Sequence, residues 1–187
     1  MYSGSRNFTP VLSGRSQTRQ TTVTWIPHGR PGTVATLEAM KELAIRDSRT
    51  LGIQALAQTA VGFRAPELIP FAIDSYIRDR WVTLPDPLDA ELIRAPVNQL
   101  RALEAGRPFT GDCDDAATLI CSLLAAVEYP CWFSAIRMPG AVDFSHVFAQ
   151  APDLTTGRVY DLDPTVEPSE LPISGYEERL IVRVFYE

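Results

Sequence analysis

The feature that most constrains the fold is the segment GDCDDAATLICSLLAAV, residues 111–127, in which a cysteine precedes a long apolar helix pattern. Asp112 occupies the N-cap position and Cys113 would be the first residue of the helix. Apolar residues then recur at the i, i+3, i+4, i+7 spacing of a largely buried helix: Ala116, Leu119, Ile120, Leu123, Leu124 and Val127. The sequence therefore predicts a buried helix with a cysteine at its amino end.

The position of Cys113 favours a reactive thiol. Free N–H groups and the positive end of the helix dipole stabilise a thiolate at a helix N-terminus, although the charges of Asp114 and Asp115 oppose it. The other two cysteines, Cys121 and Cys131, form no C-x-x-C pair. Cys121 lies roughly 12 Å along the helix from Cys113, too far for a disulfide. We expect three reduced thiols, of which Cys121 and Cys131 are structural.

A nucleophilic thiolate needs a base, and the chain has two histidines. His28 lies in a PHGRPG turn, where we expect a solvated side chain. His146 lies in the middle of an apolar strand pattern, where an unpaired imidazole would be costly. An acid that orients the imidazole would come from the next strand, which carries Asp161 and Asp163. Because residues two apart on a strand point to the same face, the alternation of side chains does not distinguish these two aspartates.

Three segments in this order, GDCDDAATLICSLLAAVEYPCWF, SHVFAQ and VYDLDPT, resemble the core of the transglutaminase-like superfamily, part of the broader papain-like fold. The family pattern is G-x-C at a helix start, then a strand with H-x-[WF], then a strand ending in D-[PS]-T. The resemblance implies Cys113 as nucleophile, His146 as general base and then acid, and Asp163 rather than Asp161 as the orienting acid. Phe148 stands where the family often has Trp. The resemblance implies no cofactor and no metal.

The implied reaction is acyl transfer through a thioester, in which water gives peptidase or amidase activity and a second amine gives transfer. The Cys113 backbone N–H and one further donor would hold the oxyanion, and Trp81, Asn98 and Gln99 are the candidate donors. The run RDRWVTLPDPLDAELIRAPVNQLRALEAGRPFTGDCDD is also similar to small transglutaminase-like proteins of tailed bacteriophages. That similarity implies a phage or virion protein.

The order of the expected elements predicts an α+β fold with a papain- or transglutaminase-like core. The helical N-terminal half, with the nucleophile at a helix N-terminus, would pack on a C-terminal antiparallel sheet. We expect helices at 33–47 with Thr33 as N-cap, 51–61, 66–81 and 95–106, and a loop at 82–92. We expect strands at 18–26, 130–138, 143–151, 157–163 and 179–187, with 143–151 central. A basic extended arm, 1–32, would precede a single domain, 33–187.

Charge is unevenly distributed, because the formal net charge is −6 while residues 1–36 hold four arginines and no acid. The remaining residues therefore carry −10. Such an arm suggests contact with an acidic surface, which could be another protein such as a virion protein, this protein itself or nucleic acid; alternatively, the arm is a solvated tail. The arm lacks the aromatic and basic interleaving of a nucleic-acid module. No 18-residue apolar run and no apolar signal segment are present, so we expect no membrane partner and a location in the bacterial cytoplasm or a virion.

Two further interpretations remain open at this stage. A divalent metal could be held by a mixed set of ligands, although such a set is unusual for zinc: Asp112, Cys113, Asp114, His146, Asp161 and Asp163. Alternatively, the protein could be a non-catalytic assembly or tail protein that keeps the fold and docks through the arm. The three interpretations differ in whether Cys113 reacts, binds metal or does neither.

Overall fold

The computed structural model describes residues 8–15, 20–27, 29–87 and 91–184. Its helices are α1 (Arg30–Ser48), α2 (Leu51–Val61), α3 (Ile69–Arg78), α4 (Pro96–Glu104) and α5 (Cys113–Ala126), with short 3-10 turns at Pro66–Leu68 and Pro168–Glu170. Its strands are β1 (Phe8–Arg15), β2 (Gln20–Pro27), β3 (Trp81–Thr83), β4 (Glu91–Ile93), β5 (Phe109–Gly111), β6 (Trp132–Arg137), β7 (His146–Pro152), β8 (Val159–Leu162) and β9 (Glu178–Arg183). No helix in the described part of the chain is long and apolar enough to cross a membrane.

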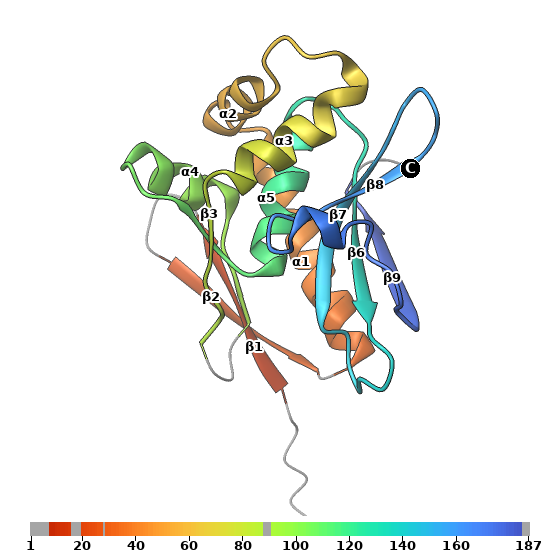
Figure 1. Cartoon of the computed structure of the whole chain (residues 1–187). Helices are drawn as coiled ribbons and strands as arrows, with labels where there is room; N and C mark the ends of the chain where they lie inside the picture. Colours follow the sequence, from red (N-terminus) through yellow and green to blue (C-terminus); the bar gives the residue numbers. More distant parts are fainter. Residues whose placement is uncertain (1–7, 16–19, 28, 88–90, 185–187) are drawn as a thin grey trace, which may run out of the picture.

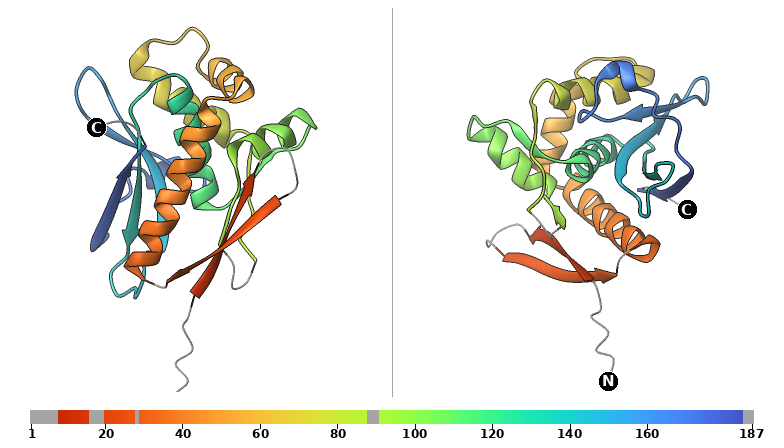
Figure 2. Two further views of the ribbon diagram at one scale, coloured as in Figure 1. Left: turned by 180° about the vertical axis from the view of Figure 1, so that it is seen from behind. Right: turned by 60° about the horizontal axis from the view of Figure 1, so that its bottom comes forward.

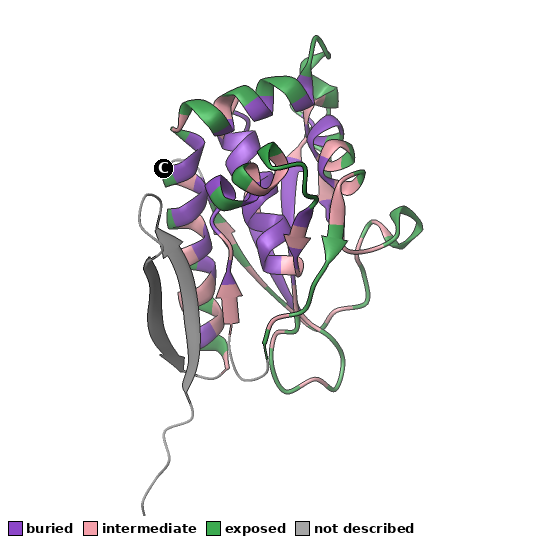
Figure 3. Ribbon diagram, turned by 90° about the vertical axis from the view of Figure 1, so that its left-hand side faces the viewer, coloured by how far each residue is buried: buried purple, intermediate pink, exposed green. Residues whose placement is uncertain are grey.

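Helix α5 forms the centre of the molecule (Figure 1). It contacts α1, α2, α3 and α4, and on another side it packs against β7. Every residue from Asp114 to Ala125 is buried, which Figure 3 shows as a continuous buried stretch through the interior. Burial of this apolar surface is the main stabilising contribution. The predicted buried helix beginning at Cys113 is confirmed.

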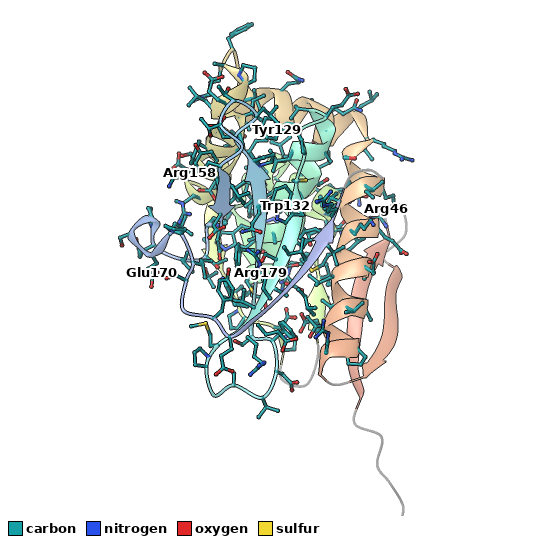
Figure 4. All side chains as sticks on the ribbon, turned by 90° about the vertical axis from the view of Figure 1, so that its right-hand side faces the viewer. Arg46, Tyr129, Trp132, Arg158, Glu170 and Arg179 are labelled. Atoms are coloured by element: carbon teal, nitrogen blue, oxygen red, sulfur yellow. The ribbon has the colours of Figure 1, made fainter. Side chains whose placement is uncertain are left out.

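The four-stranded sheet has the order β8-β7-β6-β9, and all its pairs are antiparallel. Strand β7 lies between β6 and β8, so it is central as predicted, and α5 packs against it. Five of its seven residues are buried. Figure 4 looks onto the sheet from the side opposite the helices, with Trp132 and Arg179 labelled over it. The structure confirms a mixed fold of helices and sheets, in which helices pack on an antiparallel sheet from the C-terminal half.

A second layer of strands lies on the other side of α1 (Figure 2). Strands β1 and β2 form an antiparallel hairpin, and β1 also pairs in parallel with β4. The predicted arm therefore includes backbone paired with a strand 80 residues further along the chain. Its side chains lie outside the described residues, as does His28, so its binding role and the boundary between 1–32 and 33–187 stay predictions.

Several expected elements need correction. Helix α1 begins at Arg30 rather than after Thr33, because Gly29 with φ 74° serves as the N-cap and Pro31 suits the first turn. The segment 82–92 is not all loop, since it contributes to β3 and β4. Strands this short carry too few residues for a period to show. His146 is the first residue of β7 rather than the middle of a strand, so its side chain lies at the sheet end.

Candidate active site

Cys113 reaches the N-terminus of α5 from β5, which ends at Gly111 and pairs in parallel with β3. A Cβ atom at Gly111 would overlap the side chain of Asp115, and its φ of 151° is also unfavourable for other residues. The glycine thus lets the first turn of the helix lie against the incoming strand. Asp112 holds the N-cap position, but its side chain makes no capping hydrogen bond, contrary to the usual role of an N-cap aspartate.

Asp115 ties this helix end to the segment after β4. Its two carboxylate oxygens accept hydrogen bonds from the backbone N–H and the guanidinium of Arg94. Burial raises the pKa of Asp115 to about 7, while Arg94 opposes that rise. A buried carboxylate with such a partner is a strong structural constraint, because removing either group leaves the other unpaired.

His146 joins Cys113 and Asp163. Its Nε2 lies 2.6 Å from Oδ2 of Asp163, and its ring is also a hydrogen-bond partner of the Cys113 side chain. Because an imidazole has two nitrogens, Nδ1 is the one left for the thiol. The His146 side chain is 21% exposed, whereas that of Asp163 is 1% exposed. The ring also stacks against Phe148, with centroids 6.0 Å apart.

Electrostatics favour the charged form of this histidine. Burial lowers the pKa of His146, but the hydrogen bonds and charges of Asp163 and Cys113 outweigh burial and raise it to about 10. An imidazolium beside a thiol at a helix N-terminus is the environment in which a thiolate is stabilised. The imidazole of His146 is therefore charged at neutral pH and lies beside the thiol group.

Asp163 is held in place from two sides. Its Oδ1 accepts hydrogen bonds from the backbone N–H (2.9 Å) and the hydroxyl (2.6 Å) of Thr165. Arg78 of α3 donates to the Asp163 carbonyl at 2.6 Å and also to the carbonyl of Val166. Asp74, one turn earlier on α3, accepts the Asp163 backbone N–H. Thus the D-P-T sequence and α3 together leave Oδ2 free to bind the imidazole.

Asp161 is engaged elsewhere. Its Oδ1 accepts from Nε2 of Gln150 at 2.6 Å, and its Oδ2 accepts from the backbone N–H of Ile173 at 2.8 Å. Strand β8 ends at Leu162, so Asp163 leaves the strand and the parity shared with Asp161 no longer applies. Of the two aspartates that periodicity could not separate, the structure brings Asp163 to His146.

The three candidate oxyanion donors are placed differently. Gln99 is buried, but its side chain donates to the carbonyl of Thr110 and accepts from the N–H of Thr110. Asn98 is exposed and accepts from Arg101. The indole N–H of Trp81 is buried and has no hydrogen-bond partner in the described part of the chain, although Trp81 does not line the cleft at Cys113. The Gln99 side chain is thus already bonded to Thr110, which conflicts with a role as oxyanion donor. The indole N–H of Trp81 remains an unused donor among the described residues.

A cleft of about 320 Å³ opens at Cys113 and His146. Strand β4, the start of α1 and the loop before β7 contribute to its walls together with the start of α5. The lining residues are Gly29, Gly32, Thr33, Thr36, Leu37, Met40, Glu91, Asp112, Cys113, Asp114, Ala135, Asp143, Phe144, Ser145, His146 and Val147. Sequence reasoning missed the contributions of α1 and β4, because nothing local in GRPGT or in AELI marks a cleft wall.

The expected metal-ligand set does not assemble as one group. Asp161 is turned away, and His146 is bound by Asp163 and Cys113. A different acidic group, Asp86, Asp112 and Asp115, brings ligand atoms within 4.8 Å of one another. The guanidinium of Arg94 pairs with Asp115 and lies 3.6 Å from Asp86, so it already supplies positive charge there.

The other two cysteines are buried and, like Cys113, free of disulfides, as expected. Burial raises the pKa of Cys121 well above its ordinary value, which keeps that thiol protonated. Among the three thiols, Cys113 alone lines the cleft. The site therefore combines a partly exposed thiol with an imidazole that is hydrogen-bonded to a buried carboxylate, and both lie at a cleft. In such a site a cysteine can act as a nucleophile.

Comparison with known proteins agrees with the fold. No protein-family model matches the chain, and no curated protein matches it. Among solved structures, a candidate protease from Parabacteroides distasonis is similar with a TM-score of 0.51 and 18% identity, covering 83% of this chain and 35% of that one. A candidate cysteine protease from Cytophaga hutchinsonii gives a TM-score of 0.44 and 14% identity over 70% of this chain and 50% of that one. The chain thus spans half or less of each neighbour.

Proposed function

We propose that the protein is a cysteine-dependent acyl-transfer enzyme of the transglutaminase-like type, with Cys113 as nucleophile, His146 as base and acid, and Asp163 as the orienting acid. The observation that carries this proposal is the single imidazole that contacts both the Cys113 side chain and, at 2.6 Å, the buried Asp163 carboxylate. The description of the P. distasonis neighbour as a candidate protease supports the same class of reaction.

The proposed reaction starts from the thiolate and imidazolium pair. The Cys113 sulfur attacks a substrate carbonyl, and the oxyanion accepts the Cys113 backbone N–H, which is one of the unpaired donors at the helix start. The His146 Nδ1–H protonates the leaving amine as the C–N bond breaks, which leaves a thioester. Water, deprotonated by the now neutral imidazole, then attacks the thioester and releases the acid.

Hydrolysis is the favoured outcome because the His146 ring is partly exposed, so water can reach the thioester. An amine in place of water would give transfer by the same steps. The phage relationship and docking through the arm stay predictions, since neither the described residues nor the comparisons bear on them.

Site-by-site alkylation by iodoacetamide tests the proposal directly. Mass spectrometry would follow Cys113, Cys121 and Cys131 from pH 5 to 9 in the native protein and in His146→Ala. We expect rapid reaction of Cys113 already at pH 6, protection of the two buried cysteines, and a loss of at least about tenfold in the His146→Ala rate at pH 6. A Cys113 that reacts no faster than a free thiol, with no effect of His146→Ala, would rule out the proposed nucleophile.

A further inference from the structure

The wall of the cleft next to Cys113 is acidic. Four of its lining residues carry carboxyl groups, namely Glu91, Asp112, Asp114 and Asp143, and none of the described side chains that line it is a lysine or arginine. Among the described lining residues the basic side chain is that of His146, which is already matched by Asp163. Clusters of acidic residues are common on protein surfaces. The burial and the hydrogen-bond partners of each carboxyl group therefore decide whether this wall can bind a cation.

Asp114 is the unusual member of this group. It is 2% exposed, and neither of its carboxylate oxygens accepts a hydrogen bond from any donor among the described residues. The groups that meet it are other carboxyls, those of Glu91 from β4 and of its helix neighbours Asp112 and Asp115. An ionised carboxylate buried without a cation is costly, so in the free protein Asp114 is left to share protons with the neighbouring carboxyls of Asp112 and Glu91.

Asp115 provides an internal comparison, because it lies in the same helical turn and is equally buried. Its carboxylate is satisfied by the backbone N–H and guanidinium of Arg94. Asp114 faces the cleft instead, where no such cation is supplied by the described residues. Of the two neighbours, Asp114 is therefore the one to which the described residues supply no cation.

Glu91 of β4 is half-buried and contacts Asp114. Burial and the charges of Asp112 and Asp86 raise its pKa, while its contact with Asp114 lowers it. Two carboxyls in contact share a proton when no cation is present. A positive group placed beside them would allow both to ionise and would donate charge-assisted hydrogen bonds to their oxygens.

We propose that Glu91 and Asp114 form a subsite for a cationic group of the substrate, an ammonium or guanidinium, beside the carbonyl that Cys113 attacks. The subsite rests on the proposed function, because it lies in the cleft of the proposed nucleophile. The substrate class is therefore a peptide or amide that carries a basic side chain near the reacting carbonyl.

Binding of matched peptides to the Cys113→Ala protein tests this subsite without relying on catalysis. The probes are acetyl-Ala-Arg-Ala-amide and the same peptide with citrulline, which has nearly the same shape without the charge. NMR titration should show the arginine peptide binding at least about tenfold more tightly. When Glu91→Gln and Asp114→Asn are added to the Cys113→Ala protein, the ratio of the two peptide affinities should fall to about one.

The control variant carries Glu42→Gln and Asp79→Asn, which remove two exposed charges away from the cleft and should leave the ratio unchanged. Three results would contradict the proposed subsite. The first is equal affinity of the two peptides, and the second is no measurable binding of either peptide. The third is a control variant that loses its preference for the arginine peptide to the same extent as the Glu91→Gln, Asp114→Asn variant. Failure of the subsite is separable from failure of the proposed function, because the alkylation of Cys113 by uncharged iodoacetamide does not involve the carboxyl pair.

Discussion

At the scale of single residues, the site depends on which hydrogen-bond partners each acid finds. Asp163 and Asp161 are two residues apart, yet one binds an imidazole and the other an amide side chain and a backbone N–H. Asp114 and Asp115 are adjacent, yet one is matched by Arg94 and the other by no described cation. Burial makes each of these choices energetically important, because an unpaired buried carboxylate is costly.

The two candidate acids give the first prediction. Asp163→Asn should lower the rate of Cys113 alkylation at pH 6 by at least about tenfold, because an amide does not stabilise the imidazolium. Asp161→Asn is the matched control and should change that rate little, since Asp161 has no contact with His146. Iodoacetamide labelling followed by mass spectrometry measures both. Equal effects of the two variants would remove the distinction that the structure makes between them.

At the scale of elements, two contacts between segments position the site. The first is the close approach of the first turn of α5 to β5, which only a glycine at 111 allows. The second is the contact between α3 and the chain after β8, where Asp74 and Arg78 bind both the N–H and the carbonyl of Asp163. These contacts fix Cys113 and Asp163 relative to the rest of the fold.

Gly111→Ala should destabilise the protein by about 1–3 kcal/mol, because the new methyl group overlaps the buried Asp115 side chain. Gly106→Ala is the control for backbone strain alone, since Gly106 also has a positive φ but nothing within 4 Å of its Cβ position. Urea unfolding followed by circular dichroism gives both free energies. If Gly111→Ala lowers the free energy of unfolding no more than Gly106→Ala does, the close approach of α5 to β5 at Gly111 would be contradicted.

Arg78→Lys should slow Cys113 alkylation while the protein stays folded. A lysine keeps the positive charge but cannot reach Asp74 and the carbonyls of Asp163 and Val166 at once. Arg80→Lys is the neighbouring control, because Arg80 lies two residues after the end of α3 and donates to the Tyr76 carbonyl of that helix rather than to the segment around Asp163. If the two variants alkylate equally fast and the His146 ring signals in NMR are unchanged, α3 does not position the acid.

At the scale of the whole molecule, the site is coupled to global stability through proton binding. The pKa of His146 is raised from 6.5 to about 10, so between these values the folded protein binds a proton that the unfolded chain releases. The stabilising contribution of the imidazolium is therefore complete below pH 6.5 and is lost as pH rises through about 10.

The free energy of unfolding should accordingly fall with pH above about 6.5, with a slope from this group of up to about 1.4 kcal/mol per pH unit. Urea titrations at pH 6, 7, 8 and 9 would compare the native protein with His146→Gln. Groups other than Cys113, which pairs with His146, titrate alike in both proteins, so the difference between the two slopes reports on the net proton uptake of the Cys113–His146 pair. Parallel pH dependences would show that the pair binds no extra proton in the folded state.

The sequence by itself determined the elements whose signals are local. The apolar spacing of 116–127 predicted α5, the start of that helix placed Cys113, and the strand patterns predicted β6, β7 and β8 in antiparallel order. The tertiary structure decided which groups meet. The end of β8 separates Asp163 from Asp161, and Thr110 occupies the side chain of Gln99. The three-residue strand β4, which pairs with β1, carries Glu91 to its contact with Asp114. Such contacts join residues that are distant along the chain, and local periodicity carries no information about them.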